Sequence, residues 1–118
     1  MAWKFSPTGS VSAQISDKIR SDILTGVYPP GSQIPPVRAL AIEAAVNPNT
    51  MQKALALLEE EGIIYARATA GRYVTTDLSV INAARSRAKL AAARAIIEEA
   101  RASGINKEEL IQLIKEEM

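Results

Sequence analysis

The sequence of 118 residues contains no cysteine and no histidine. This excludes disulfide frameworks and zinc fingers, as well as the Cys and His side chains that serve enzymes as nucleophiles and bases. General acid–base catalysis at neutral pH usually needs a His or a carboxylate with a tuned pKa. The acidic residues instead occur in runs such as Glu59–Glu61, without the spacing of a metal-binding loop. We predict a protein with no catalytic activity, no cofactor and no metal.

Long apolar runs are also absent. No apolar stretch approaches the ~20 residues that cross a bilayer. The first residues, Met1 to Phe5, lack the charged start and long apolar core of a secretion signal. We therefore expect a cytoplasmic protein with no membrane partner.

The chain has no marked excess of positive charge, since 14 Lys and Arg face 13 Asp and Glu. DNA-binding domains usually carry a clear basic excess. The balance is similar in both parts of the chain, with seven basic and seven acidic residues in 1–77 and seven and six in 78–118. A DNA-binding function thus requires the basic residues to gather on one face.

Three amphipathic helices are predicted in the first half of the chain. Val11–Ile23 repeats an apolar residue every four positions, which indicates a helix with one buried stripe. A second helix is expected to start near Pro36, because proline is tolerated in the first turn. Asn47 as N-cap and Pro48 as first residue then begin a third helix that reaches about Glu60. Two short helices joined by so tight a turn form a helix-turn-helix.

A β-hairpin is predicted after the third helix. Residues 63–67 and 72–76 are typical of two short strands, and the connection Ala68–Gly71 has hairpin length and a glycine. Three helices followed by a hairpin form the winged-helix layout. The sequence therefore predicts a mainly α-helical protein with a small β-hairpin, in which residues 1–77 form a winged helix-turn-helix domain.

Residues 78–118 are predicted to form a helical dimerisation tail. A long alanine-rich helix, with Ser79 as N-cap, is expected to reach Gly104, and Asn106 is expected to cap a last short helix with Glu109. A helix of this length has too much apolar surface to bury alone. Eight apolar residues are predicted to form the dimer contact: Ile81, Ala84, Ala88, Ala91, Ala95, Ile96, Leu110 and Ile114.

The third helix has the residues needed to read a DNA groove. Because Met51, Ala54, Leu55 and Leu58 must face the core, the opposite face presents Asn49, Gln52 and Lys53, followed by small Ala56. Amide side chains can bond adenine bidentately, and Thr50 offers a methyl group and a hydroxyl. For an isolated helix, a merely solvated polar face would be the better interpretation. The tight turn before the helix and the hairpin after it favour groove reading.

Three arginines lie where they could contact DNA together with this face of the third helix. Arg38 stands at the start of the second helix, where it can reach a phosphate or a guanine edge. Arg67 and Arg72 flank the hairpin tip, where a wing would meet the backbone or minor groove. The alternative for each is a surface ion pair of little energetic worth.

A set of turn, core and arginine positions has the spacing of a known family: Ile19–Gly26, Pro30-Gly31, Ile34–Ala41, Asn49–Met51, Ala54, Leu55, Leu58, Glu59, Glu61–Ile64 and Gly71–Val74. On these residues, 11–76 resembles the N-terminal domain of the GntR family of bacterial transcription regulators. The resemblance implies a winged helix in which Arg38, Thr50 and Gly71 hold the usual DNA-contact positions. It implies further contacts from Asn47, Asn49 and Gln52.

The chain departs from the family pattern in two places. Thr69 stands where the wing normally has a glycine, so the tip geometry is expected to differ, and Thr69 is included among the candidate contacts. Pro36 replaces a common serine, so the second helix must be capped in another way. The tail is too short for a large effector domain and resembles the short YtrA-type branch, whose tail serves dimerisation.

Together these features predict a sequence-specific transcription regulator, expected to be a repressor, that binds a pseudo-palindromic double-stranded DNA operator as a homodimer. Two alternatives are a winged helix used for protein–protein contacts and a module that binds nucleic acid without sequence preference. A small-molecule effector, if the protein has one, is expected at Asp77–Ile81. A last hypothesis pairs the basic residues of the long helix with acidic residues of the last helix, in the same or the partner chain: Arg85, Arg87 and Lys89 with Glu108, Glu109, Glu116 or Glu117.

Overall fold

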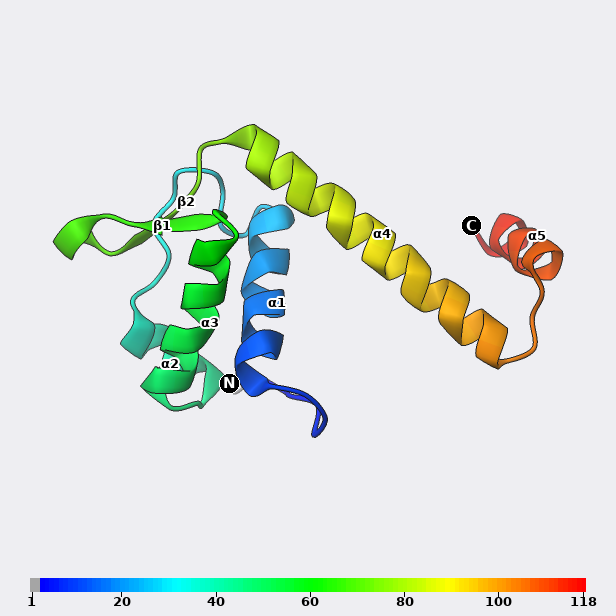
Figure 1. Ribbon diagram of the computed structural model, residues 1–118, viewed down its shortest axis with the longest axis horizontal. Coiled ribbons are helices and arrows are strands. Elements are labelled where there is room, and N and C mark those ends of the chain that lie inside the picture. The colour runs from blue at the N-terminus through cyan, green and yellow to red at the C-terminus, as the bar shows by residue number, and fades with distance from the viewer. Residues whose placement is uncertain (1–2) are drawn as a thin grey trace. The chain divides into compact units, whose positions relative to one another are not determined.

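The computed structural model describes residues 3–118. Met1 and Ala2 lie outside the described residues, although the predicted first domain and the N-terminal segment both begin with them. Within this part, a helix-turn-helix is followed by a two-stranded hairpin and two further helices, as predicted (Figure 1). The elements are α1 (Val11–Leu24), α2 (Val37–Ala44), α3 (Pro48–Glu60), β1 (Ile64–Ala66), a 3-10 turn η1 (Ala68–Ala70), β2 (Arg72–Val74), α4 (Leu78–Ala102) and α5 (Lys107–Glu117). The chain divides into two compact units, one up to Ala83 and one from Ala84 onward.

Helix α1 forms because Ser10 caps it and one stripe of isoleucines is buried. The Ser10 hydroxyl accepts the Ala13 N–H at 3.3 Å. Ile15, Ile19 and Ile23 are at most 2% exposed, which confirms the four-residue repeat. Each such side chain contributes roughly 1.5–3 kcal/mol by leaving water.

The turn between α2 and α3 is built from local backbone chemistry. Ala45 ends α2 in the left-handed conformation, with φ 58° and ψ 47°. Asn47 then caps α3, because its Oδ1 accepts the Asn49 N–H at 2.7 Å, and Pro48 is the first helical residue, as predicted. Pro36 stands before α2 in extended conformation and provides no side-chain cap.

The core of this unit lies between α1, α2 and α3. The predicted inward face of α3 is confirmed, since its four apolar residues are at most 1% exposed: Met51, Ala54, Leu55 and Leu58. Leu40, Ala41 and Ala44 of α2 are also buried. The opposite face of α3 is therefore fixed on the outside of the unit.

The hairpin pairs Ile64 with Val74, Tyr65 with Tyr73 and Ala66 with Arg72. The strands are shorter than the predicted ranges 63–67 and 72–76. β1 begins one residue later than predicted because the Ile63 N–H still closes the end of α3 by donating to Leu58 O. Hydrogen bonds nevertheless continue past both ends, from Thr75 N to Ile63 O at 2.9 Å and from Arg67 N to Gly71 O at 2.8 Å.

A third extended segment, Gly31–Ile34, lies along β2. Val74 N donates to Ser32 O at 2.9 Å, Ile34 N donates to Arg72 O at 2.9 Å, and Gln33 pairs with Tyr73 in an antiparallel bridge. Ile34 is 2% exposed, so it anchors the segment in the core. The wing therefore has a support that the sequence pattern did not indicate.

Helix α4 starts two residues earlier than a helix capped by Ser79 would, and Ser79 is not its cap. The Asp77 carboxylate accepts the Ser79 N–H at 3.0 Å and the Ser79 hydroxyl at 2.6 Å. The carboxylate is the better acceptor because its charge complements the positive end of the helix dipole.

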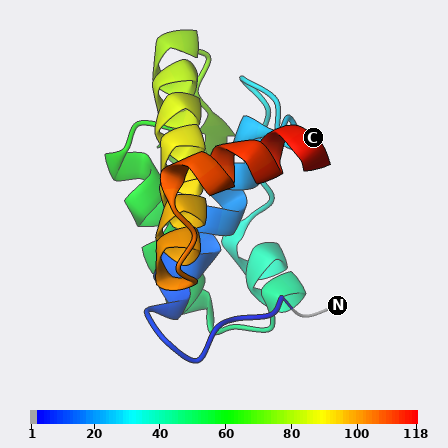
Figure 2. The same ribbon diagram turned by 90° about the vertical axis from the view of Figure 1, so that its right-hand side faces the viewer.

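The second unit continues α4 and reverses at Gly104 into α5, which runs in a different direction (Figures 1 and 2). Asn106 and Glu109 form the predicted capping box, with Glu109 N donating to Asn106 Oδ1 at 2.8 Å. Ala100 is buried at 6% exposure, but most apolar side chains of this unit are exposed.

Candidate nucleic-acid interface

The outer face of α3 presents polar side chains from the first turns of the helix. Asn49, Gln52, Lys53 and Ala56 are exposed, and Thr50 is half-buried. Because the apolar residues of α3 are fully buried, this face cannot turn inward. It offers amide donors and acceptors, one cation and a small residue that allows close approach, which is the chemistry needed to read base edges.

Asn47 lies immediately before this face. Its Oδ1 accepts the Asn49 N–H, and its Nδ2 has two donors that it can offer to a ligand. The cap also fixes where α3 begins, and the positive end of the helix dipole at this point favours an anion such as phosphate.

Arg38 is exposed in the first turn of α2, as predicted. It borders a shallow apolar depression of about 510 Å³ on the helix-turn-helix turn, lined by Arg38, Ala41, Ile42, Ala45, Val46 and Pro48. Ile42, one turn after Arg38, is 81% exposed and was not predicted as a surface feature. The i, i+4 spacing of Arg38 and Ile42 is the sequence signal that places both on one helix face.

The wing carries a stack of side chains on one face. The rings of Tyr65 and Tyr73 lie 6.1 Å apart at 28°, and the Arg67 guanidinium lies 5.0 Å from the centre of the Tyr73 ring. This cation–π contact holds Arg67 against the hairpin. Thr69 lies in the 3-10 turn at the tip, and Gly71 follows it with φ 96°.

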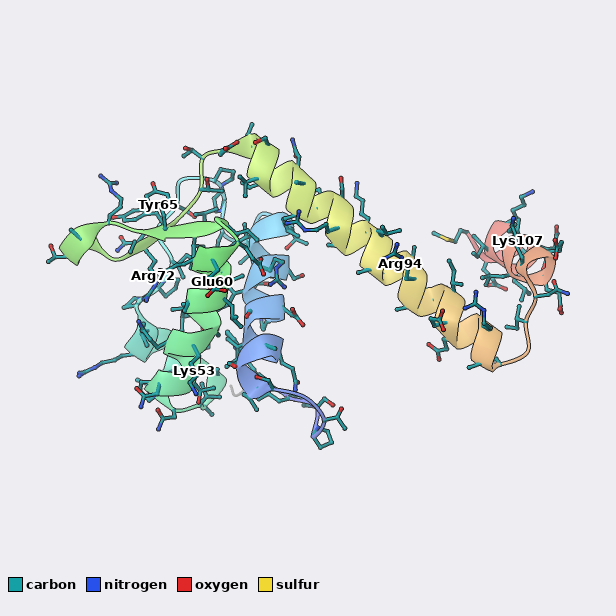
Figure 3. The ribbon with its side chains drawn as sticks, in the orientation of Figure 1. Lys53, Glu60, Tyr65, Arg72, Arg94 and Lys107 are labelled. Atoms are coloured by element: carbon teal, nitrogen blue, oxygen red, sulfur yellow. The ribbon has the colours of Figure 1, made fainter. Side chains whose placement is uncertain are left out.

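Arg72 lies on the opposite face of the hairpin from Tyr65, toward α3 (Figure 3). Its Nε donates to the Glu59 carboxylate, and the Arg72 side chain is only 20% exposed. Of the two interpretations given for Arg72, a DNA contact or an ion pair, the structure shows the ion pair. The pair connects the wing to the C-terminal part of α3, a contact that the sequence did not predict because the residues belong to different elements.

A second ion pair ties α1 to the end of α3. Arg20 Nε donates to Glu61 Oε2 at 2.9 Å, and its Nη1 donates to Asp17 Oδ1 at 2.7 Å. The bond to Glu61, followed by the one to Asp17, raises the pKa of Arg20 against the opposing effect of burial. Two of the three carboxylates in the run Glu59–Glu61 are thus paired with arginines, which lowers the repulsion that this run would exert on a polyanion.

The predicted dimer residues fall into two groups. Ile81 and Ala84 are each 2% exposed, so both are buried within the single chain. The remaining six are exposed or, for Leu110, partly exposed: Ala88, Ala91, Ala95, Ile96, Leu110 and Ile114. Other large apolar residues of the tail are also exposed, namely Leu90, Ile97, Ile111 and Leu113 at 43–51%.

Two acidic residues of the last helix already have hydrogen-bond partners in α5 or at its N-cap. Both were expected to meet Arg85, Arg87 or Lys89. Glu109 accepts the Asn106 N–H at 3.3 Å, and Glu116 accepts a bond from Gln112 at 3.0 Å. The predicted pairing between the helices stays a prediction.

The segment Asp77–Ile81, where an effector was expected, forms the start of α4. Hydrogen bonds from the Ser79 hydroxyl and N–H lower the pKa of the Asp77 carboxyl, so this carboxylate stays ionised into acidic conditions.

No helix among residues 3–118 has the length and apolar character required to span a bilayer.

The geometry defines a class of protein, a winged helix-turn-helix protein with an exposed polar recognition helix. Residues 11–74 match the family model described as "Bacterial regulatory proteins, gntR family". The chain is similar to the HTH-type transcriptional repressor YtrA of Bacillus subtilis, with 33% identity over 105 residues that cover 87% of this chain and 80% of YtrA. The chain belongs to the GntR family, and it is a DNA-binding transcriptional regulator rather than an enzyme.

Solved structures agree with this assignment. A GntR family transcriptional regulator from Listeria monocytogenes is 36% identical, with a TM-score of 0.86 over 95% of this chain and 98% of that chain. AraR(DBD) in complex with operator ORX1 is 25% identical, with a TM-score of 0.56 over 64% of this chain and 95% of that chain. The short YtrA-like architecture, with a winged helix and two further helices, is thus confirmed.

Proposed function

We propose that the protein binds a pseudo-palindromic operator as a homodimer and acts as a repressor. The observation that carries the proposal is the outer face of α3, where Asn49, Gln52 and Lys53 are exposed and cannot turn inward. Two relatives support it by their own descriptions, YtrA as a repressor and AraR(DBD) as a domain in complex with its operator.

In the proposed complex, α3 enters the major groove. Asn49 and Gln52 pair with adenine edges, Thr50 contacts a thymine methyl or a phosphate, and Lys53 contacts a phosphate. Arg38 supplies the guanine contact, because α3 contains no arginine. Asn47 offers its Nδ2 donors to the backbone next to the start of the helix.

The wing tip provides the second contact, at the minor groove or its backbone. Arg67, Thr69 and Gly71 approach the DNA from the tip. Arg72 keeps its Nε bond to Glu59 and offers the terminal nitrogens of its guanidinium to a phosphate.

Dimerisation is proposed for the tail, residues 78–118, with the winged helix in 1–77. The alanine row Ala88, Ala91 and Ala95 allows close helix approach, and exposed Ile96 and Ile114 add apolar area around it. A two-fold dimer uses the same surface on both copies. It therefore requires two symmetry-related half-sites, about 34–36 Å apart or a multiple of that distance.

The test uses DNA from upstream of the protein's own gene. DNase footprinting is expected to map two symmetric half-sites, and binding is expected to fall sharply when about five base pairs are inserted between them but to recover partly with about ten. Footprints that cover one unsymmetric site, or binding that ignores the spacing, would contradict the dimeric operator. Regulation by a repressor further predicts higher transcription when the gene is deleted.

One observation favours a second candidate, a winged helix that contacts another protein. Ile42 is 81% exposed beside the apolar depression on the helix-turn-helix turn. If Ile42→Ser abolishes regulation in cells but leaves operator binding unchanged, this surface contacts a protein. Equal regulation by Ile42→Ser and wild type would remove the second candidate.

A cytoplasmic location and an effector remain further proposals. A regulator acts where the DNA is, so we expect it in the cytoplasm. An effector that binds at Asp77–Ile81 would act on the connection between the wing and α4.

A further inference from the structure

We infer that Gln33 is a positioning residue for the wing tip, a role that rests on the proposed function of the wing as a DNA contact. The Gln33 Nε2 donates to the Ala70 carbonyl at 2.8 Å, across 37 residues of sequence. Ala70 is the last residue of the 3-10 turn η1, and it lies between the two tip residues proposed to contact DNA, Thr69 and Gly71. One side chain from outside the hairpin thus holds its tip.

The backbone of Gln33 is itself fixed in place. Ile34 N donates to Arg72 O at 2.9 Å, Val74 N donates to Ser32 O at 2.9 Å, and Gln33 bridges to Tyr73. Ile34, the next residue, is buried at 2% exposure. The amide group therefore extends from a base that is tied both to β2 and to the core, so it can transmit this rigidity to the tip.

The tip needs such a support because its own hydrogen bonds are few. Arg67 N donates to Gly71 O at 2.8 Å and Ala70 N donates to Arg67 O at 2.7 Å, while Ala68 has a positive φ of 42° that an L-residue rarely adopts. The wing also has Thr69 where the resemblance would place a glycine. The bond from Gln33 offsets the tendency of this strained turn to open.

Gly71 shows how closely the Gln33 side chain packs. A Cβ atom built on Gly71 would lie 2.9 Å from Gln33 Nε2, which is closer than side chains normally approach, and Gly71 has φ 96°. The backbone conformation favours glycine at this position, and a Cβ there would displace the end of the Gln33 side chain. The Gln33 side chain therefore packs against Gly71 while it bonds to Ala70, and we infer that it orients the backbone of both residues.

The substitution that isolates this role is Gln33→Met, which keeps the length and neutrality of the side chain but removes the N–H donor. The matched control is Gln14→Met, because Gln14 Nε2 also donates to main-chain carbonyls, those of Ser6 and Thr8 at 3.2 Å, but supports the N-terminal segment instead of the wing. Neither variant changes the net charge, so nonspecific attraction to DNA stays constant.

Two measurements test the inference on the full-length protein. Amide hydrogen exchange followed by NMR is expected to show faster exchange in Gln33→Met at Arg67 and Ala70, whose N–H groups donate the hydrogen bonds of the tip, with unchanged exchange at Leu55 and Leu58 in the core. Binding to a duplex from upstream of its own gene is expected to weaken about three- to tenfold, the equivalent of one hydrogen bond. Gln14→Met is expected to match wild type at the wing and in binding.

Arg38→Ala, measured beside these variants, distinguishes a failure of the Gln33 positioning role from a failure of the proposed DNA-binding function. If Arg38→Ala weakens selective binding but Gln33→Met matches wild type in affinity and in exchange at the tip, the positioning role is wrong and the proposed function stands. If Gln33→Met instead loses core protection as much as tip protection, the side chain acts on the whole fold and the inference is also overturned. If wild type itself binds the upstream duplex no more tightly than a scrambled duplex, the proposed function fails, and the inference that rests on it fails too.

Discussion

The Oδ1 atom of Asn47 accepts the N–H of Asn49, and this single bond starts α3 at the residue where the tight turn ends. The same residue was expected from the resemblance to contact DNA. Its Nδ2 supplies the donors for that contact, so the cap and the proposed donor contact use different atoms of one side chain.

We predict that Asn47→Ala lowers the free energy of unfolding by about 1 kcal/mol, because a backbone N–H of the first turn loses its acceptor. Asn47→Ser keeps an acceptor and is expected to restore most of this stability without restoring the amide donors. Urea denaturation measures the stability, and operator titration measures the binding. Wild-type stability of Asn47→Ala would contradict the role of the cap.

Arg38 is predicted to carry base selectivity. Arg38→Ala is expected to cost about 1–3 kcal/mol of operator binding and to relax the preference at one guanine per half-site. Competition among operators changed at single base pairs measures this. Arg94→Ala, which removes the same charge from an exposed position in α4, serves as control and is expected to bind like wild type. Weakening that is uniform over all sequences would make Arg38 a phosphate contact instead.

Among the elements, the helices follow from the sequence because their information is local. The repeat of isoleucines in α1, the cap at Asn47 and the capping box at Asn106 each involve residues within four positions of one another. The structure places these features as predicted. The polar outer face of α3 could be predicted for the same reason, since it is the complement of a local apolar pattern.

The elements that the sequence did not reveal depend on contacts between distant residues. The segment Gly31–Ile34 has no strand pattern of its own, and it becomes extended through hydrogen bonds to β2, about forty residues later. The contact of Arg72 with Glu59 crosses from the wing to α3 in the same way. The correction of the α4 cap from Ser79 to Asp77 has a chemical cause, because two acceptable capping residues were two positions apart and the carboxylate is the stronger acceptor.

The start of α4 is predicted to depend on pH through Asp77. The pKa of its carboxyl is lowered in the folded chain, so the stabilisation is present above its ordinary value of about 4 and is lost as the pH falls through the lowered value. Asp77→Asn keeps an acceptor for the Ser79 N–H but does not titrate. Between about pH 6 and about pH 3, circular dichroism melts are expected to show a smaller loss of helix stability for Asp77→Asn than for wild type. Identical losses in both proteins would contradict the role of Asp77.

For the whole molecule, the second unit exposes more apolar surface than its two helices can cover. Leu90 and Ile96 remain 51% and 56% exposed, and the alanine row beside them is open. A DNA-binding protein gains from covering this surface with a second copy, because two half-sites then bind together. Dimerisation is therefore expected to control affinity as strongly as any base contact.

We predict that Ala95→Glu shifts the protein toward the monomer, because it places a charge in the proposed apolar interface. Ser86→Glu is the control, since the helical repeat puts the exposed Ser86 on the opposite face of α4. Analytical ultracentrifugation is expected to show at least about a tenfold weaker dimer for Ala95→Glu and an unchanged dimer for Ser86→Glu. Equal dimer constants for Ala95→Glu and wild type would contradict the interface.

The charges of the tail have their own test within the same assay. Reversing both Arg85 and Arg87 to Glu is expected to weaken the dimer if they meet the acidic residues of α5. An unchanged dimer constant would reject this pairing and leave the apolar contact as the basis of dimerisation.

The most direct test of the central claim is the salt dependence of binding to DNA from upstream of the protein's own gene, compared with a scrambled duplex of the same composition. A selective regulator is predicted to bind the upstream DNA about 10³-fold or more tightly than the scrambled duplex, with a preference that persists as salt rises. Weak binding that is equal on both duplexes and disappears at moderate salt would contradict the account, because backbone electrostatics alone would then explain it.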